Sequence, residues 1–160
     1  MIRTVALSCS LFLLAFTARG ADEAKGEKVE STTYSDYFVK NTAGIKDDST
    51  YLVFTDKEGF EKVFNLRPPL MGKKSVVMPG NVFEKNLVIA AIKRGNAITT
   101  YTIDKLTNEG ETLYIQYKAV VGKPSTATFA SPLIVTADRG KAKKVVFIEN
   151  EKTVATIEVK

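Results

Sequence analysis

Histidine and tryptophan are absent from this 160-residue sequence, and cysteine occurs once, at Cys9. Without histidine the chain lacks the commonest general base, the commonest metal ligand and the base of every Ser-His or Cys-His nucleophile pair. One cysteine alone leaves no set of sulfur ligands for a metal ion. These absences predict that the protein is not an enzyme, with no catalytic residues, no cofactor and no metal.

The serine and acidic residues form no recognisable catalytic motif. A serine nucleophile without histidine would need a lysine as base, and no S-x-x-K motif occurs after residue 20. Asp47-Asp48 and Glu109-Gly110-Glu111 lack the spacing of a calcium loop. Nothing selects a pair of carboxylates at the separation that glycoside hydrolysis requires. A hydrolase that uses carboxylates alone is therefore only a third alternative.

Basic residues outnumber acidic ones by 23 to 18, which gives a net charge of +5. They gather at Lys73-Lys74 and at Arg139, Lys141, Lys143 and Lys144. A site for single-stranded nucleic acid combines a basic groove with aromatic rings on which bases stack, whereas the aromatic residues here alternate as strand-core positions. The lysines are better explained as turn residues and strand-edge charges that discourage aggregation. We therefore expect no nucleic-acid partner.

The first twenty residues have the three parts of a secretory signal peptide. Met1-Ile2-Arg3 is a short positive start, Val5 to Phe16 is apolar, and the following residues to Gly20 include small ones. A membrane-spanning helix needs about 20 apolar residues, and this stretch is shorter. We expect cleavage after Gly20, with cleavage after Ala21 as the second choice, and no membrane span after cleavage.

Cys9 follows Ala6-Leu7-Ser8, a run that loosely resembles the lipobox of a lipoprotein. The most apolar part of the leader, Leu11 to Phe16, would follow that cut, so we favour Cys9 as a small residue inside a discarded leader. The mature protein is then expected in the periplasm or outside the cell. It would have no disulfide and would depend on a hydrophobic core.

Beyond the leader, the pattern predicts a polar lead-in and then one β-rich domain. Residues 21–36 carry many charges and few apolar groups, which is typical of a flexible segment, and residues 37–160 form the domain. β-Branched or alternating apolar runs predict strands at 37–39, 50–55, 87–92, 98–106, 113–117, 132–137, 144–148 and 153–159. Turn signals separate the later strands at 94–96, 108–110, 120–125, 138–141 and 149–152.

One short helix is predicted after Asp56, whose carboxylate can accept hydrogen bonds from the free amides of the first turn. Glu58 suits the positive end of the helix dipole. The apolar face of this helix consists of Phe60, Val63 and Phe64. The helix should end at Asn65 and the Pro68-Pro69 pair, and residues 66–81 form a long connection with a short strand at 75–78.

The run from Leu87 to Ile92 is apolar throughout, which indicates a strand buried on both faces. Strands every 8–12 residues with turn signals between them predict an antiparallel β-sandwich or a partly open barrel. With one short helix near the N-terminal side, the fold class is β-rich α+β. The sequence leaves open whether the helix covers a sandwich or closes one end of a barrel.

The segment from Val82 to Ile103 resembles the core of the PrcB C-terminal domain family, named for a lipoprotein partner of a surface protease of an oral spirochaete. Four further stretches agree in order, so the resemblance covers roughly Ile45 to Val159; they are Thr50 to Phe64, Glu111 to Tyr117, Ser131 to Val135 and Val145 to Ile148. The resemblance implies a domain that binds or stabilises a secreted or surface protease. The loop at 96–101 departs from the family pattern, because it lacks a proline and a Gly-Gly pair.

Binding residues are expected in and beside this loop, because loops on a rigid β scaffold commonly carry binding sites. The candidates are Arg94, Asn96, Thr99, Thr100 and Tyr101. The resemblance makes Tyr101 the best-matched position, and the alternative is a strand tyrosine packed at a sheet edge. The expected function is an exported, non-enzymatic domain that binds another protein in the envelope or outside the cell.

A second function fits the same composition. A small-molecule or polysaccharide binding module of the cell envelope would use exposed aromatic residues, such as Tyr114 and Phe129. The two hypotheses differ in whether the aromatic residues or the loop residues make the contacts.

Overall fold

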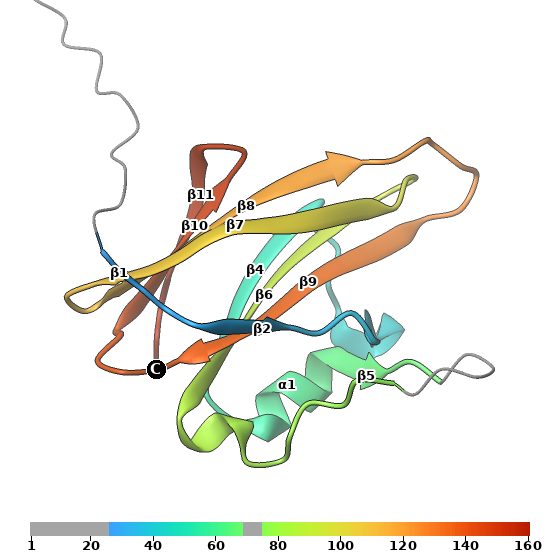
Figure 1. Cartoon of the computed structure of the whole chain (residues 1–160). Helices are drawn as coiled ribbons and strands as arrows, with labels where there is room; N and C mark the ends of the chain where they lie inside the picture. Colours follow the sequence, from blue (N-terminus) through green and yellow to red (C-terminus); the bar gives the residue numbers. More distant parts are fainter. Residues whose placement is uncertain (1–25, 69–74) are drawn as a thin grey trace, which may run out of the picture.

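The structure, a computed structural model, describes residues 26–68 and 75–160 and arranges the strands in three sheets (Figure 1). The first sheet has the spatial order β1 (Glu27–Lys28), β7 (Thr99–Glu109), β8 (Thr112–Val121), β10 (Lys144–Glu149) and β11 (Lys152–Glu158). The second has the order β2 (Ser31–Thr33), β9 (Phe129–Asp138), β6 (Asn86–Gly95) and β4 (Ser49–Phe54). The third pairs β3 (Tyr37–Val39) with β5 (Phe64–Leu66). Three short helices complete the described chain: η1 (Asn41–Ala43), α1 (Lys57–Val63) and η2 (Val82–Glu84).

The first and second sheets face each other as a β-sandwich, as the strand pattern predicts. Inward side chains of β8 are Leu113, Ile115 and Tyr117, all almost fully buried. They share one hydrophobic cluster with Leu87 and Ile89 of β6 in the opposite sheet. The predicted alternation of buried and outward residues along β8 is therefore confirmed.

The second sheet is buried on both faces, which confirms the prediction for the run from Leu87 to Ile92. Odd-numbered residues of β6 face the first sheet, whereas Val88, Ala90 and Ile92 join a second hydrophobic cluster. That second cluster contains Phe60 of α1 and Phe64 of β5. Helix α1 and the third sheet thus cover the outer face of the sandwich rather than one end of it.

Helix α1 begins as predicted. Asp56 is its N-cap, and the carboxylate accepts a 2.8 Å hydrogen bond from the backbone N–H of Gly59. The predicted end is wrong by two residues, because Phe64 leaves the helix and starts β5. Pairing of Phe64 with Val39 and burial of its ring among Phe54 and Phe60 favour the strand there.

The N-terminal segment differs from the expected flexible lead-in over 21–36. In its described part, β1 pairs with β7 and β2 pairs with β9, so the chain crosses from the edge of the first sheet to the edge of the second (Figure 1). The side chains of β1 and β2 are exposed, and the pairing uses backbone groups. Polar composition therefore did not reveal these strands. The expected strand at 75–78 also does not form, since no strand lies between residue 75 and η2.

Among the described strand pairs, β8 with β10 is the parallel one, and the others are antiparallel. The hairpins confirm the predicted turns: Gly110 joins β7 to β8 with φ of 62°, and Asn150 and Glu151 join β10 to β11 with φ of 48° and 68°. A bulge at Asp104 interrupts β7.

No helix within residues 26–68 and 75–160 is both long and apolar enough to cross a membrane. The expected signal peptide at 1–20 lies outside the described residues.

Candidate functional site

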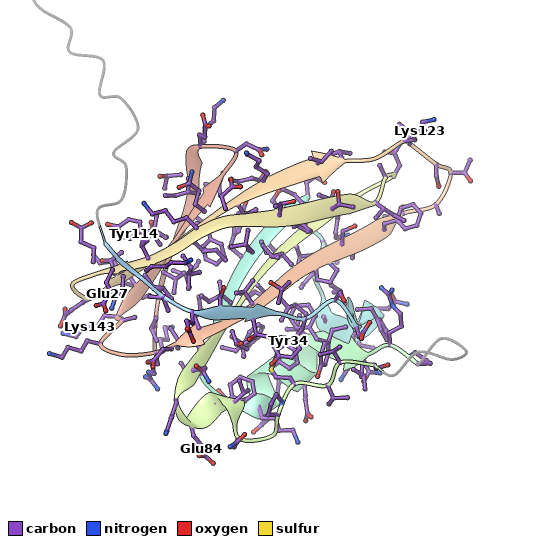
Figure 2. All side chains as sticks on the ribbon, viewed as in Figure 1. Glu27, Tyr34, Glu84, Tyr114, Lys123 and Lys143 are labelled. Carbon is purple, nitrogen blue, oxygen red and sulfur yellow. The ribbon has the colours of Figure 1, made fainter. Side chains whose placement is uncertain are left out.

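The two connections that follow β6 and β8 meet at one end of the sandwich. The backbone N–H of Ser125 donates to the carbonyl of Asn96 at 2.7 Å, and the N–H of Gly122 donates to the carbonyl of Ile98 at 2.9 Å. Figure 2 shows Lys123 at the tip of the second connection, with Tyr114 and Glu27 toward the other end of the sandwich. The loop predicted for binding is therefore short, and backbone hydrogen bonds hold it.

Two of the five predicted site residues have structural roles: Arg94 bonds to the segment before β4, and Asn96 holds the loop. The Arg94 guanidinium donates to the carbonyl of Ile45, and its backbone N–H donates to the carbonyl of Asp48 at 2.9 Å. Asn96 contributes its carbonyl to the contact with Ser125. Neither Arg94 nor Asn96 lines the hollow that lies beside this loop and that the other three predicted residues share.

The other three predicted residues, Thr99, Thr100 and Tyr101, line a hollow of about 420 Å³ that we call the groove. The groove lies between the start of β7 and the start of β9, beside the connection from β2 to β3. Its lining consists of residues 33–35, Tyr37, Arg67, residues 98–101 and residues 129–134.

Tyr101 joins the two sheets inside the groove. Its hydroxyl donates to the carbonyl of Ser131 at 2.8 Å, and its ring packs edge-to-face on Tyr117 with 6.0 Å between centroids. Burial raises the pKa of the Tyr101 hydroxyl, and the Glu149 carboxylate raises it further. Tyr101 is therefore a neutral, half-buried hydrogen-bond donor.

Behind Tyr101 lies a polar cluster that joins four strands. The Tyr117 hydroxyl donates to Glu149 at 3.1 Å, and the Lys93 ammonium contacts Glu149 at 2.8 Å and the Ser49 hydroxyl at 3.0 Å. Burial, followed by the charge of Glu149, raises the pKa of Tyr117. The polar groups of this cluster bond to one another, so we interpret the cluster as a support for the groove and not as a ligand site.

The edge of β7 is open along the groove. The backbone N–H of Thr99 points to this side, where it donates to the Ser131 hydroxyl at 3.0 Å. Backbone groups of alternate residues in a strand point to the same side, so those of Tyr101 and Ile103 point to this side of β7 as well. Tyr101 lines the groove, and Ile103 lies just beyond its lining. Strand β1 pairs with β7 only at Thr107 and Asn108, and no other described strand pairs with this edge.

The facing edge of β9 is protected instead. The N–H of Tyr34 donates to the carbonyl of Ile134 at 2.9 Å, which fixes the side to which Ile134 points. Pro132 lies two residues earlier, so its backbone points to the same edge. As a proline it has no N–H to donate there. An added strand would therefore find hydrogen-bond partners on β7 and a block on β9.

Three exposed apolar side chains lie at this end of the sandwich, and one of them, that of Ile98, lines the groove. Ile98, Val120 and Val121 are 55%, 63% and 67% exposed, and Val121 pairs with Thr99 across the strands. We call these three residues the apolar rim. The sequence pattern does not predict the rim. Its one signal is the pair of valines before Gly122, which is unusual in a segment predicted as a polar loop.

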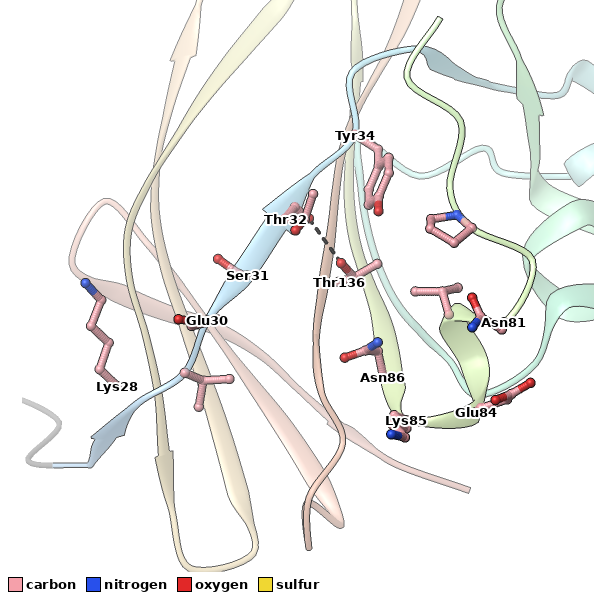
Figure 3. Close-up of a pocket in the computed structure, with 13 residues that line it drawn as sticks. Lys28, Glu30, Ser31, Thr32, Tyr34, Asn81, Glu84, Lys85, Asn86 and Thr136 are labelled. Carbon is pink, nitrogen blue, oxygen red and sulfur yellow. Dashed lines mark hydrogen bonds between the residues drawn. The ribbon is translucent and has the colours of Figure 1, made fainter.

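A second hollow of about 770 Å³, the polar hollow, lies beside β2 (Figure 3). Thr136 forms part of its lining, and its hydroxyl donates to the carbonyl of Thr32 at 3.4 Å. Its charged and amide side chains have neither a hydrogen bond nor an ion pair among the described residues; they are Lys28, Glu30, Asn81, Glu84, Lys85 and Asn86.

A third, smaller hollow of about 250 Å³ lies between α1 and residues 77–80, with Phe60, Phe64 and Phe83 in its walls. In the part of the chain that the structure describes, no three His, Cys, Asp or Glu residues are grouped to hold a metal ion. Tyr114 and Phe129 do not form one site, because Phe129 lines the groove and Tyr114 lies toward the other end of the sandwich (Figure 2).

Comparison with protein-family models, with curated proteins and with solved structures finds no match for this chain. The resemblance to the PrcB C-terminal domain family stays a prediction.

Proposed function

We propose that this protein is an exported, non-enzymatic domain that binds an extended segment of another polypeptide in the groove. The segment adds a strand to the open edge of β7, with main-chain hydrogen bonds to Tyr101 and Ile103. The observation that carries the proposal is the part of this edge from Thr99 to Ile103, with which no described strand pairs although its start borders a hollow of about 420 Å³. Strand addition to a sheet edge is a recurring mode of peptide recognition.

The apolar rim supports the same proposal. Ile98 both lines the groove and belongs to the rim, and Val121 pairs with Thr99 of the groove, so a segment that leaves the groove past Thr99 would cover the side chains of Ile98 and Val121. Exposed apolar groups beside a polar edge commonly mark contact surfaces. Main-chain pairing would supply affinity, and the rim would select apolar side chains.

The sequence supports export and the nature of the partner. The signal-peptide pattern at 1–20 supports a location in the periplasm or outside the cell. The resemblance to the PrcB C-terminal domain family points to a secreted or surface protease as the owner of the bound segment. Three of the five residues predicted for contact, Thr99, Thr100 and Tyr101, line the groove.

The test begins with peptides selected from a random library on the immobilised protein. A selected peptide is then resynthesised with methyl groups on every other backbone nitrogen, in the two possible registers. A segment paired with β7 uses one set of its N–H groups, so one register should weaken binding at least roughly tenfold and the other should not.

Hydrogen exchange of the protein locates the contact. The amides of Tyr101 and Ile103 should become protected when the peptide binds, whereas exposed amides of β11 should not change. Failure to recover any peptide, or equal tolerance of both methylated registers, contradicts the proposal.

The polar hollow favours a second candidate function, the binding of a small polyhydroxylated ligand such as an oligosaccharide. Asn81 and Asn86, with Glu30 and Glu84, offer amide and carboxylate groups that have no described partner and that suit sugar hydroxyls. Figure 3 shows the asparagines on the side of η2 and Glu30 on the side of β2. The aromatic contacts expected from Tyr114 and Phe129 do not contribute, since neither lines this hollow.

Calorimetric titration with a panel of cell-wall oligosaccharides tests this second candidate. Binding that falls at least roughly tenfold in Asn86→Ala, and that persists in the exposed control Asn41→Ala, would support it. A panel without any measurable binding would exclude it and leave the groove unaffected.

A further inference from the structure

Among the described residues, Arg67 is the one charged residue that lines the groove. Its guanidinium has neither a hydrogen bond nor an ion pair within the described residues. The other lining side chains are apolar or carry hydroxyl groups, such as those of Phe129, Leu133, Thr99 and Ser131. An exposed positive group therefore borders a mostly apolar groove without a counter-charge among the described residues.

The backbone of Arg67 is held in place. Its N–H donates to the carbonyl of Asp36 at 2.7 Å, and its own carbonyl accepts from the Ser75 hydroxyl at 3.4 Å. The carboxylate of the same Asp36 accepts a hydrogen bond from the N–H of Val76 at 2.7 Å. Asp36 thus fixes the chain around Arg67 without neutralising the guanidinium.

The open edge of β7 is short. It begins at Thr99, whose N–H is joined to Ser131, and it ends where the N–H of Val29 donates to the carbonyl of Leu106 at 2.9 Å. A segment that continued in both directions would meet both of these links. A segment that ends inside the groove meets only one of them.

We infer that the groove binds the C-terminal end of its partner, with the terminal carboxylate on the Arg67 guanidinium and an apolar last side chain among Phe129 and Leu133. This inference rests on the proposed function. The guanidinium offers a planar fork of donors that matches both oxygens of a carboxylate. The apolar side chains of Phe129 and Leu133 suit an apolar last side chain, because burying a polar one there without a hydrogen bond would cost free energy.

The probes are two arrays of fluorescein-labelled hexapeptides with identical random sequences, one with free C-terminal carboxylates and one with C-terminal amides. The protein variants are Arg67→Gln, Arg67→Lys and the control Arg139→Gln. Arg139 is an exposed arginine beyond the far end of β9, where its backbone N–H bonds to Lys85. Equal thermal unfolding midpoints of the three variants establish that each is folded.

We expect the free acids to bind the unaltered protein at least roughly tenfold more tightly than the matching amides. Arg67→Gln should abolish this preference, Arg67→Lys should retain part of it, and Arg139→Gln should retain all of it. Two outcomes overturn the inference while the proposed function stands. In the first, acids and amides bind equally. In the second, the binding of amides depends on Arg67, but only for amides that carry an internal Asp or Glu. If neither array binds, the proposed function fails together with the inference.

Discussion

The hydroxyl of Tyr101 on β7 donates a 2.8 Å hydrogen bond to the backbone carbonyl of Ser131 on β9, and this bond joins the two sheets where the sandwich is open. The same serine accepts the N–H of Thr99 at 3.0 Å through its hydroxyl. Ser131 is therefore the point at which β9 holds the start of β7 beside the groove.

Tyr101→Phe should destabilise the protein by about 1 kcal/mol, because the half-buried carbonyl of Ser131 loses its donor. Urea unfolding measures the change. Tyr114→Phe is the matched control, since the Tyr114 hydroxyl has no described partner, and its unfolding midpoint should not move. An equal loss in both variants would show that the contact with Ser131 contributes nothing specific.

Stability should fall at alkaline pH. The pKa values of Tyr101 and Tyr117 are raised in the folded protein, chiefly by burial, so the folded state holds these protons more tightly than the unfolded state. Their contribution is complete below the unfolded pKa of about 10 and decreases as the pH rises above it. Urea unfolding across that range should show the decrease, and a Tyr101→Phe/Tyr117→Phe double variant should show less of it. An unchanged slope in the double variant would refute this assignment.

The apolar rim should matter for binding and not for stability. Val121→Lys changes an exposed side chain, so the free energy of unfolding should stay within about 0.5 kcal/mol of its original value. Binding of a selected peptide should weaken markedly. Val154→Lys, at a valine of β11 that is 39% exposed, is the matched control and should bind normally. If Val121→Lys binds like the control, the rim is not part of the contact.

The N-cap of α1 can be tested directly. Asp56→Ala removes the acceptor of the Gly59 N–H and should lower the free energy of unfolding by about 1 kcal/mol. Asp47→Ala, at an exposed aspartate without a described partner, should leave it unchanged. Chemical denaturation of both variants makes the comparison.

Gly26 is expected to be required for the docking of β1. A Cβ atom at this position would lie 2.5 Å from the backbone oxygen of Asn108, closer than non-bonded atoms approach. Gly26→Ala should therefore detach β1 and expose the Val29 amide to hydrogen exchange. Gly80→Ala, whose Cβ would meet no atom within 4 Å, should leave that amide protected. Equal protection in both variants would mean that β1 can shift to accommodate the methyl group.

The elements that the sequence predicted well are those whose signals lie within a few residues. The carboxylate of Asp56 needs only the N–H of Gly59, and the alternation of Leu113, Ile115 and Tyr117 lies within one strand. Elements that depend on distant partners escaped prediction. Strands β1 and β2 have exposed side chains, and they exist because β7 and β9 offer backbone partners.

The bulge at Asp104 illustrates a second limit. Ile103 packs against the core and Leu106 is buried in it, although strict alternation allows only one of two residues three apart to face inward. A register shift of this kind follows from packing across the sheets, which periodicity along one strand does not show.

For the site, the sequence led to Thr99, Thr100 and Tyr101 because they follow a loop on a predicted scaffold. The same criterion points to Arg94 and Asn96, but Arg94 bonds to the segment before β4 and Asn96 holds the loop. Arg67 could not have been chosen, since only the third sheet brings it to the groove.

The parallel pairing of β8 with β10 has a consequence for how the chain folds. Strands β7 and β8 can form as a hairpin, and so can β10 and β11, but the two hairpins join only after β9 has crossed to the other sheet. Closing this long connection costs chain entropy before any contact between β8 and β10 forms. We expect the seam between these hairpins to assemble late, so that weakening it accelerates unfolding while refolding keeps its speed.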